Sequence, residues 1–573
     1  MGNIVSRKII SRVIGKDVDV DDININDIDI TFYKNVVSDS DYKFDFKKFL
    51  RQINKELVRV EKASAIINAN KEATIIKENL TNIWFKNTDT NYVIHYGPTN
   101  SSKTYNSINR LKRAESGVYL SPLRLLSYEV YDKLNTEGIL CDLVTGEEII
   151  NIEGSTISSR TVEMMDYKNY FDVVVIDESF MIGDSDRGKA WLKAILETNA
   201  REIHIISSLE SLDILKDILT RTNKKFETIE YKRLTPLVFK DETYPYNNPL
   251  PGSVFITFSR IDVLMEKARL ESLGYDVSIL YGNLPPEVKK EQMRKFIEKE
   301  TNICISTDVI GMGLNLPCEH IIFLKTSKYD GYQIRFLNTT EVKQIGGRAG
   351  RYGMYKTGYV WSLSHNEMIK KNLFDENKNT EKAYCGISYD SLSKFDGNIL
   401  DKLRHYSKVD FIPNELKDIV VLEDINKYIQ MCIGSTNILN IKDTKTAWTL
   451  LNLPVKKKLD FWDSVVTKIY RGKNINIPFT PLDIVDIVSL EVAEEMISNI
   501  ELLCYLYNTS IGKTLISDTY FEEIISTKYI IIDNINKYLL DKKLGSVKKC
   551  GKCGKNIGID NRNKLCDYCY YML

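Results

Sequence analysis

The middle of the chain alternates between short apolar runs and longer segments whose apolar residues recur at helical spacing. Runs rich in β-branched residues occur near residues 92–96, 117–121, 140–145, 156–161, 171–176 and 202–207. Strands that alternate with helices in this way are typical of a parallel sheet with helices packed on its faces. The pattern therefore predicts a doubly wound α/β domain.

A second set of apolar runs follows a proline-rich stretch, which indicates a linker and a second domain of the same class. The prolines stand at positions 236, 245, 249 and 251. Beyond them, strands are expected near residues 254–258, 276–281, 302–307 and 320–325. The repeated order of strand and helix again favours a parallel sheet.

The patterning changes at both ends of the chain. Beyond about residue 370, long amphipathic segments with few glycines predict a helical region. One helix is expected to open with Thr480 as N-cap and Pro481 in its first turn, and to carry apolar residues at helical spacing over 484–507. Near the start, residues 18–30 alternate like a half-buried strand and residues 41–80 have a helical pattern. They predict a small accessory domain with no evident chemistry.

The composition is that of an ordinary globular protein without an overall charge. The chain has 573 residues, of which 43% are hydrophobic and 27% are charged, and its 78 basic residues balance 78 acidic ones. Any binding of nucleic acid must therefore come from local basic patches. Apolar runs fall short of the roughly 18–20 residues that span a bilayer, so no membrane contact is expected.

A phosphate-binding loop is indicated directly after the strand at 92–96, where the chain reads GPTNSSKT and enters a helical segment. In such a loop the backbone amides and the helix N-terminus surround the β-phosphate of ATP, Lys103 neutralises charge and Thr104 ligates Mg²⁺. Because Ser102 stands where the motif has its second glycine, an ordinary strand–turn–helix is the alternative on this string alone. The predicted nucleotide-binding residues of the loop are Gly97, Pro98, Thr99, Asn100, Ser101, Ser102, Lys103 and Thr104.

Two adjacent acids, Asp177 and Glu178, follow the apolar run at 171–176. A buried parallel strand delivers the residues at its end to the carboxyl edge of the sheet, where the ligand sites of open α/β sheets lie. Asp177 is expected to hold Mg²⁺, directly or through water, and Glu178 to orient and deprotonate the water that attacks the γ-phosphate. In isolation the pair could be a solvated strand end, but a phosphate loop upstream favours catalysis.

Two arginines three residues apart, Arg348 and Arg351, follow Gln344 and two glycines. On a helix they lie one turn apart, so both guanidinium groups can point into one cleft and stabilise the charge that develops on the γ-phosphoryl oxygens. A solvated basic helix face is the alternative. The residues predicted to act in hydrolysis of ATP, in a cleft between the two domains, are Lys103, Asp177, Glu178, Gln344, Arg348 and Arg351.

These three motifs occur in the order, and at roughly the separations, of a superfamily 2 helicase. Further matching strings lie at residues 121–126, 141–148, 161–164, 187–191, 233–237, 281–286 and 311–316. Together they resemble the DExH-type ATP-dependent RNA helicase of the mitochondrial degradosome and its bacterial and viral relatives. The resemblance covers about residues 90–365 and continues more faintly to about residue 540.

The resemblance implies two tandem RecA-like P-loop domains and ATP-driven unwinding of RNA duplexes in the 3′→5′ direction. It implies that Gly313 lies at the nucleotide, and that Arg124, Thr161 and Thr307 contact the sugar-phosphate backbone of single-stranded or duplex RNA, independently of base sequence. Without the resemblance, Arg124 would be a charged residue near a helix start. A partner nuclease is left open.

Two alternatives belong to different classes. A DNA helicase could use the same backbone contacts, which need not involve the 2′-hydroxyl of RNA. A nucleic-acid-binding scaffold would have lost ATP hydrolysis through its altered phosphate loop, although the presence of Lys103 and Glu178 argues against this.

Two positions depart from the family pattern. Ser102 adds a Cβ atom where the backbone must approach a phosphate closely, so weaker ATP binding is expected. Phe180 is the fourth residue of the Asp-Glu motif, where relatives have a polar residue. Coupling between hydrolysis and strand movement is therefore expected to run through Gln344 alone, or to be looser.

Two CxxC pairs near the C-terminus, Cys550 with Cys553 and Cys566 with Cys569, are separated by twelve residues. This spacing matches a tetrahedral four-thiolate site for Zn²⁺, and a pair of disulfides is the alternative. Residues 541–573 also hold eight Lys or Arg against three Asp, with tyrosines close by. Such a tail suits contact with phosphates and bases, and a structural clasp is equally compatible.

The N-terminus bears on location. Residues 1–16 hold four basic residues and no acids, as a transit peptide does, and Gly2 fits a myristoylation signal. An acidic stretch at 17–29 follows at once, whereas transit peptides are poor in acids. We therefore favour a short basic helix and a cytoplasmic location, in a bacterium or a virus-infected host cell.

The expected architecture has five parts. They are an accessory domain at 1–85, RecA-like domains at 86–238 and 239–368, a helical C-terminal domain at 369–542 and a zinc-binding tail at 543–573.

Overall fold

The computed structural model describes residues 71–86, 89–311, 313–314, 316–330, 333–375, 379–455 and 459–540. The chain divides into two compact units, Met1–Glu78 with His405–Phe411 and Asn79–Arg404 with Ile412–Leu573. Both large sheets belong to the second unit. Most of the accessory domain predicted at 1–85, and the whole tail predicted at 543–573, lie outside the described residues.

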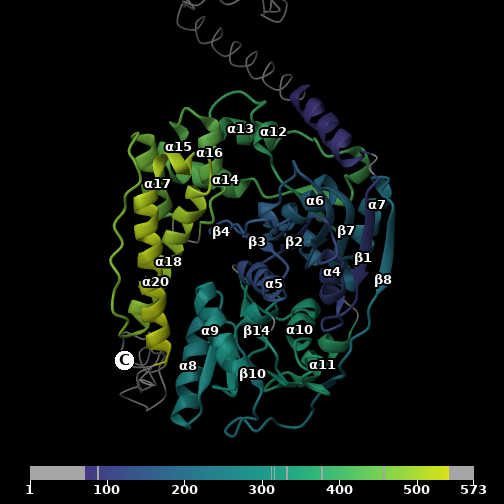
Figure 1. Cartoon of the computed structure of the whole chain (residues 1–573), viewed down its shortest axis with the longest axis vertical. Coiled ribbons are helices and arrows are strands. Elements are labelled where there is room, and N and C mark those ends of the chain that lie inside the picture. Colours follow the sequence, from purple (N-terminus) through teal and green to yellow (C-terminus); the bar gives the residue numbers. More distant parts are fainter. Residues whose placement is uncertain are drawn as a thin grey trace, which may run out of the picture. The chain divides into compact units, whose positions relative to one another are not determined.

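The first sheet has eight strands in the order β4-β3-β5-β2-β6-β7-β1-β8 (Figure 1). Neighbouring strands pair in parallel, except β3 with β4, so the predicted parallel sheet is confirmed. The strands are β1 (Asn91–Tyr96), β2 (Gly117–Ser121), β3 (Cys141–Val144), β4 (Ile149–Ile150), β5 (Ile157–Thr161), β6 (Tyr170–Ile176), β7 (Asn199–Ser207) and β8 (Phe226–Glu230). The α-helices of this domain are α4 (Lys103–Leu111), α5 (Arg124–Thr136), α6 (Gly188–Glu197) and α7 (Leu212–Arg221).

The position of β6 explains its composition. Residues 173–176 are fully buried, because a central strand of a parallel sheet is covered on both faces and needs apolar side chains on both. Strands β1 and β6 both run parallel to β7, which lies between them. The loop after β1 and the acids after β6 therefore leave the sheet at the same edge.

The second sheet has six parallel strands in the order β11-β12-β10-β13-β16-β9. They are β9 (Leu237–Phe239), β10 (Ser253–Ile256), β11 (Val277–Leu280), β12 (Ile303–Ser306), β13 (His320–Phe323) and β16 (Gly358–Ser362). The associated helices are α8 (Arg260–Ser272), α9 (Pro286–Ile297), α10 (Thr339–Gly346) and α11 (Asn366–Phe374), and β14 (Ser327–Tyr329) pairs with β15 (Ile334–Phe336) in a separate hairpin. Strand β9, inside the predicted linker, was not expected.

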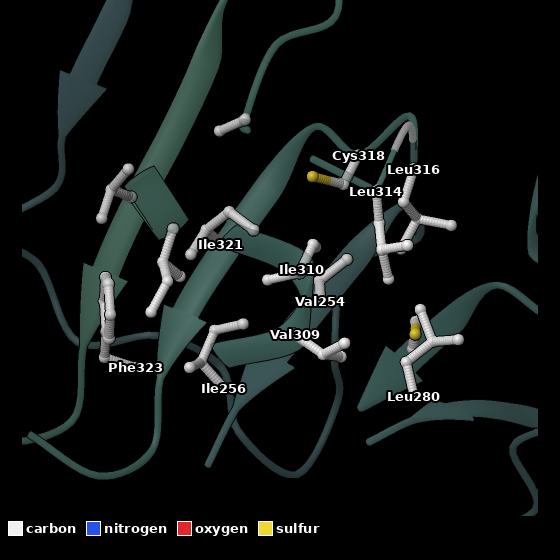
Figure 2. Close-up of a cluster of buried hydrophobic side chains, with 14 of the residues drawn as sticks. Val254, Ile256, Leu280, Val309, Ile310, Leu314, Leu316, Cys318, Ile321 and Phe323 are labelled. Carbon is white, nitrogen blue, oxygen red and sulfur yellow. The ribbon is translucent and has the colours of Figure 1, made fainter. Parts of the chain in front are cut away.

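The core of the second domain is continuous with a contact from the first. Figure 2 shows Val254 and Ile256 of β10, and Ile321 and Phe323 of β13, gathered with side chains of the 309–318 segment. Leu125 of α5 belongs to the same buried cluster. The two domains therefore share apolar packing next to the segment at 309–318.

The region beyond residue 379 is largely helical, as predicted. Its elements are β17 (Ala383–Cys385), α12 (Tyr389–Leu392), α13 (Ile399–Tyr406), β18 (Val420–Leu422), α14 (Asn426–Gly434), α15 (Thr436–Leu439), α16 (Thr444–Leu451), α17 (Asp460–Tyr470), α18 (Ile487–Tyr507), α19 (Gly512–Leu515) and α20 (Asp518–Leu540). The two longest helices, α18 and α20, run side by side (Figure 1). No helix in the described part of the chain is both long and apolar enough to cross a membrane.

The start of α18 differs from the prediction. The cap is Asp486 and not Thr480: the Asp486 carboxylate accepts from the Ser489 amide at 2.8 Å, and the Ser489 hydroxyl accepts from the Asp486 amide at 3.0 Å. This reciprocal capping box satisfies two amides that the helix leaves without partners. The helix therefore begins at Ile487, after the Asp486 cap, several residues later than the Thr480-Pro481 pattern predicted.

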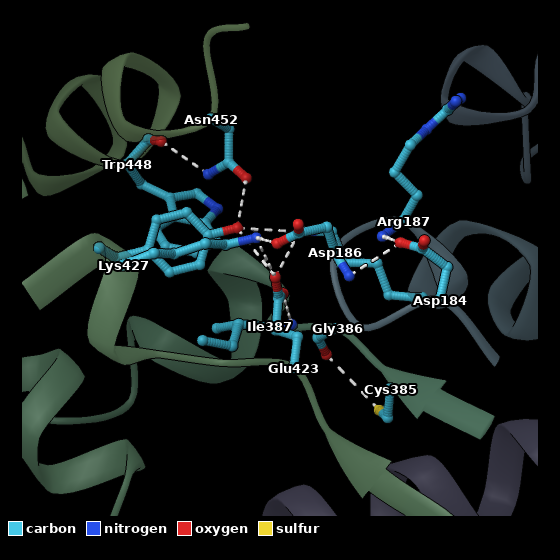
Figure 3. A network of polar contacts seen from close by, with 12 residues as sticks. Asp184, Asp186, Arg187, Cys385, Gly386, Ile387, Glu423, Lys427, Trp448 and Asn452 are labelled. Carbon is cyan, nitrogen blue, oxygen red and sulfur yellow. Dashed lines mark hydrogen bonds and ion pairs between the residues drawn. The ribbon is translucent and has the colours of Figure 1, made fainter. Parts of the chain in front are cut away.

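A buried carboxylate joins the C-terminal region to the first domain. Glu423, whose side chain is fully buried, accepts hydrogen bonds from Lys189 of α6 at 2.7 Å and from the Tyr428 hydroxyl at 3.0 Å, and it pairs with Lys427. The Ile387 amide donates to its other oxygen at 3.0 Å. Figure 3 shows Glu423 at the centre of this network. A buried charge of this kind is stable only because its oxygens are paired with cations and donors.

Candidate active site

A cavity of about 210 Å³ lies where the carboxyl edge of the first sheet meets the second domain. Both domains contribute to its wall, which is lined by Thr99, Asn100, Ser101, Ser102, Lys103, Thr104, Tyr105, Asp177, Glu178, Ile206, Leu314, Leu316, Gly347, Arg348 and Arg351. The three sequence motifs, which are far apart in the chain, therefore meet around one space.

The loop between β1 and α4 folds back on its own lysine. Lys103 Nζ donates to the carbonyl oxygens of Gly97 and Pro98, both at 2.6 Å, and lies 3.3 Å from the Ser101 hydroxyl. Gly97 has a φ of +147°, and a Cβ there would stand 2.2 Å from the Tyr231 carbonyl oxygen. Only glycine allows this approach between the loop and the end of β8.

Ser102 occupies a left-handed backbone conformation, with a φ of 66°. The motif's usual glycine adopts this conformation without strain, whereas a residue with a Cβ pays roughly 1–2 kcal/mol. The departure at Ser102 is thus a matter of backbone strain as well as of space near a phosphate.

The acid pair is held by donors from its own domain. The Asp177 carboxylate accepts from the Tyr119 hydroxyl at 2.7 Å and from Thr104 Oγ1 at 3.3 Å. The Trp191 indole donates to the Asp177 carbonyl oxygen at 2.9 Å. Glu178 has a left-handed φ of 47°; strain of this kind is typically kept at functional sites by surrounding contacts.

Burial sets the protonation of the site. It raises the pKa of Glu178, and the charge of Asp177 raises it further. It lowers the pKa of Lys103 to about 8, against the opposing effect of both carboxylates. A carboxylate with a raised pKa is a better base, and a lysine with a lowered pKa binds protons less tightly.

The two arginines reach the cavity from the irregular segment that follows α10, which ends at Gly346, so they do not lie one turn apart on a helix as predicted. Arg348 Nη2 lies 3.5 Å from Glu178 Oε1 and donates to the Gly311 carbonyl at 3.1 Å. Arg351 lines the same cavity. Gln344 stands on α10 itself, with its Cβ beside Gly311, and is absent from the described cavity wall. The structure thus brings Arg348 and Arg351 to the cavity that holds the acid pair, whereas Gln344 does not line it.

Gly313 brings the second domain close to the same carboxylate. Its φ is +93°, and a Cβ there would stand 2.6 Å from Leu126 Cδ1 and 3.4 Å from Glu178 Oε1. Glycine is the residue that meets both demands, a left-handed backbone and close approach.

A second cavity, of about 340 Å³, lies between the two domains and α18. Arg124 lines it but is already paired, with Glu147 and, at 2.9 Å, with Glu501 of α18. Thr161 ends β5 and Thr307 follows β12, and both side chains are buried. Of the three predicted RNA contacts, Arg124 lines this cavity, and the two threonines line neither this cavity nor the one around Lys103.

The zinc site predicted in the C-terminal tail is not in the part of the chain that the structure describes. Cys550, Cys553, Cys566 and Cys569 lie outside the described residues. The six cysteines that the structure does describe are buried free thiols. Within the described ranges, no group of three or more His, Cys, Asp or Glu side chains could hold a metal ion.

Sequence patterns missed three contacts at this site. Tyr119 lies inside a buried strand, where only the pairing of β2 with β6 reveals that it faces Asp177. Trp191 belongs to a matched string but carried no expected role. Arg233 opens the matched string at 233–237 but carried no expected role; it donates to the carbonyl oxygens of Gly347 and Ala349, just beyond α10.

Two known families match this arrangement. Residues 83–231 match the DEXQ-box helicase domain of Suv3, and residues 241–353 match the helicase conserved C-terminal domain. The chain contains a Suv3-type helicase core. The resemblance inferred from the motifs is thereby confirmed, and the two parallel sheets are its tandem RecA-like domains. Phe180 stands where the DEXQ motif has its glutamine, so the core departs from its own family there.

Similar proteins are named as mitochondrial RNA helicases. The helicase core is 38% identical over 311 residues to the DExH-box ATP-dependent RNA helicase DExH16 of Arabidopsis thaliana, covering 53% of this chain and 54% of that protein. It is 38% identical over 323 residues to the ATP-dependent RNA helicase SUV3 of Oryza sativa, covering 55% and 56%. It is also 38% identical over 270 residues to the ATP-dependent RNA helicase SUV3 of Saccharomyces cerevisiae, and this match covers 45% of this chain and 36% of that protein. The match thus spans about half, or less, of these relatives' length.

Among solved structures, the Escherichia coli DEAH/RHA helicase HrpB is 14% identical and covers 80% of this chain and 63% of its own, with a TM-score of 0.45.

The predicted cytoplasmic location is wrong by these comparisons. The plant and yeast relatives are all named as mitochondrial proteins. The prediction gave most weight to the acidic stretch at 17–29. A targeting signal is defined by the composition of its own segment, and residues 1–16 are basic and free of acids.

Proposed function

We propose that this helicase core hydrolyses ATP and uses the energy to unwind RNA duplexes, in the 3′→5′ direction that the resemblance implies. The observation that supports this most directly is the shared cavity: Lys103 and Glu178 from one sheet face Arg348 from the other. A nucleotide there would touch both domains, so its binding and hydrolysis would change how they pack.

The roles follow from position. Lys103 would leave its loop carbonyls to bind the phosphates, and Glu178 would orient and deprotonate the attacking water. Arg348 and Arg351 would stabilise the charge on the γ-phosphoryl group. Gln344, in the last turn of α10, would couple hydrolysis to movement along the strand. Gly313 would keep the second domain against Glu178.

Mg²⁺ fits the residues present. Thr104 Oγ1 and Asp177 Oδ2 are oxygen donors 3.3 Å apart at the cavity wall, and oxygen ligands are what this ion prefers. Thr104 and Asp177 would therefore hold it. When bound, Mg²⁺ neutralises charge on the phosphates. The hydroxyl of Tyr119 holds Asp177 in place for this task.

RNA would bind in the second cavity. Arg124 lies there, beside Lys289, and would contact phosphates without regard to base sequence. Thr161 and Thr307, at the ends of β5 and β12, keep their predicted backbone contacts as part of this proposal.

The deciding experiment is nucleic-acid-stimulated ATP hydrolysis. We expect RNA to stimulate the wild-type protein, and Glu178→Gln to lower the stimulated rate by at least about a hundredfold because the base is lost. Glu153→Gln, at an exposed position of the same domain, is the matched control and should behave like the wild type. Equal background rates in all three proteins would favour the nucleic-acid-binding scaffold. Unwinding of matched DNA duplexes, but not RNA, would favour a DNA helicase.

Zinc binding by Cys550, Cys553, Cys566 and Cys569 is a separate part of the proposal. Metal analysis of the full chain should find about one zinc per chain, following the four-thiolate spacing. Cys550→Ser with Cys566→Ser should abolish it. Absence of zinc together with loss of free thiols would instead indicate disulfides. A partner nuclease remains open.

A further inference from the structure

Arg233 connects the linker to both halves of the nucleotide cavity. Its guanidinium group donates to the Gly347 carbonyl at 2.7 Å and to the Ala349 carbonyl, while Nε donates to Thr235 at 2.7 Å. Weaker contacts, at 3.3 and 3.4 Å, reach the carbonyl and hydroxyl of Thr99 in the phosphate loop.

The two carbonyls in the second domain flank one residue. Gly347 and Ala349 stand on either side of Arg348, so Arg233 holds the peptide group directly before Arg348 and the second peptide group after it. They lie just beyond α10, where carbonyl groups lack helical partners and attract a cation. Fixing these two groups fixes the direction in which the Arg348 side chain leaves the backbone.

Arg233 is suited to this task by its chemistry. Its planar fork can donate to several oxygens at fixed angles, which a lysine cannot do. Among the described residues, its acceptors are main-chain carbonyls and one hydroxyl, with no carboxylate. A cation without a charged partner depends on all of these oxygens together, so the loop must keep its shape for Arg233 to stay in place.

The surrounding linker keeps Arg233 between the two domains. The Leu234 amide donates to the Asn100 carbonyl of the phosphate loop at 3.1 Å, and the Gly358 amide donates to Pro236 at 2.8 Å. The linker therefore contacts the phosphate loop on one side and the edge of the second sheet on the other.

We infer that Arg233 is a positioning residue that sets the Arg348 guanidinium against the phosphate loop for ATP hydrolysis. The inference rests on the proposed function. Its contacts with Gly347 and Ala349 are closer than those with Thr99, so its loss acts mainly on Arg348 and less on nucleotide binding. A displacement of about 1 Å at a catalytic group can reduce a rate about a hundredfold.

The test is a double-mutant cycle on RNA-stimulated ATP hydrolysis. Arg233→Ala should lower kcat by about ten- to a hundredfold and change KM for ATP less than about threefold. Combined with Arg348→Ala, it should cause little further loss, because both changes remove the same interaction. Lys232→Ala, at the exposed neighbouring position, is the control and should match the wild type. Arg233→Lys should fall between the two.

Each outcome separates the hypotheses. An inactive wild-type protein would overturn the proposed function and this inference with it. If the wild type is active and Arg233→Ala has the same kcat, the inference alone is overturned. It is also overturned if the fold-loss in kcat of the double variant equals the product of the fold-losses of the two single variants. Thermal unfolding checks the fold of each variant. If Arg233→Ala does not fold, the same cycle with Arg233→Lys decides, by the same criteria.

Discussion

The guanidinium group of Arg348 lies 3.5 Å from the carboxylate of Glu178, although the two residues belong to different domains. For the proposed reaction, Arg348 must exchange this carboxylate for a γ-phosphoryl oxygen, which frees Glu178 to accept a proton from water. The contact therefore links the state of the base to the presence of the nucleotide.

Nucleotide affinity should fall at alkaline pH. The pKa of Lys103 is lowered to about 8 in the free protein, chiefly by burial, and bound phosphates would raise it. Below pH 8 the lysine is already charged, so affinity is flat; above it, binding must take up a proton and Kd should rise about tenfold per pH unit. Titration of a fluorescent ATP analogue between pH 6.5 and 9.5 measures this.

The control for that titration is Lys103→Arg, which stays charged throughout the range. Its Kd for the ATP analogue is expected to be higher than that of the wild type at pH 7 and independent of pH. A wild-type profile as flat as that of the arginine variant would contradict the assignment of the pKa to Lys103.

Replacing Ser102 with glycine should stabilise the protein. Its φ of 66° is unfavourable for any residue with a Cβ, whereas glycine adopts it freely but gains freedom in the unfolded chain. The balance is expected to add about 0.5–1 kcal/mol to the unfolding free energy and to tighten ATP binding. Chemical denaturation with and without ATP provides the measurement.

Ser102→Ala separates the two explanations. It removes the hydroxyl and keeps the Cβ, so it should bring no gain. Equal stabilisation by alanine and glycine would show that the hydroxyl, and not the backbone, is responsible.

Neutralising Glu501 should strengthen RNA binding. Glu501 competes with phosphate for Arg124 and also pairs with Lys528 at 3.6 Å. In Glu501→Gln, Arg124 keeps Glu147 and Lys528 keeps Glu287, so the cations stay paired and the fold should survive. We expect affinity for single-stranded RNA to rise about three- to tenfold, roughly 1 kcal/mol.

The same variant should bind with a steeper salt dependence. One further phosphate contact changes the slope of log K against log salt by about −0.7 for a single strand. Glu495→Gln, an exposed position of the same helix, is the control. If Glu501→Gln binds more weakly or with an unchanged slope, Arg124 does not contact phosphate.

A buried histidine pair should make the first domain sensitive to acid. His95 Nε2 lies 2.8 Å from His204 Nδ1, and His95 Nδ1 lies 2.9 Å from the Tyr231 hydroxyl. Burial, then the charges of His204 and Lys103, lowers the pKa of His95 to about 4. Between pH 6.5 and pH 4, His95 is protonated in the unfolded chain but neutral in the folded chain. The unfolding free energy therefore falls as the pH falls, by about 3 kcal/mol in total.

Urea denaturation at pH 7 and pH 4.5 measures this loss, and His95→Asn is the comparison. The variant should be less stable at pH 7 because a buried contact changes, but it should lose less stability on acidification than the wild type. Equal losses in both proteins would assign the acid sensitivity to other groups.

The strands and their chemical residues could be predicted because their signals are local. A continuous apolar run marks a strand covered on both faces, and acids at its end mark the sheet edge, as Asp177 and Glu178 do. The helix at 484–507 was also visible, but its first residue depended on whether Thr480 or Asp486 captured the end amides. That competition is decided by Ser489, three positions beyond the cap.

Contacts with the main chain could not be predicted in the same way. Arg233 recognises carbonyl oxygens, which every residue carries, so no side-chain pattern marks its partners. Likewise, the sequence shows that Ser102 replaces a glycine, but only the backbone reveals the left-handed conformation. The roles of the site residues themselves remain predictions until the variants are measured.

The Glu423 network has a mechanical consequence. Because it ties the C-terminal region to α6, we expect those helices to move with the first domain if the two domains change their packing. Their contacts with the second domain, where Glu494 meets Arg260 at 3.1 Å and the hydroxyl of Tyr281, must then slip. If RNA binds in the second cavity, the part of the wall formed by the first domain and α18 would move as one unit, and the part formed by the second domain would shift relative to it.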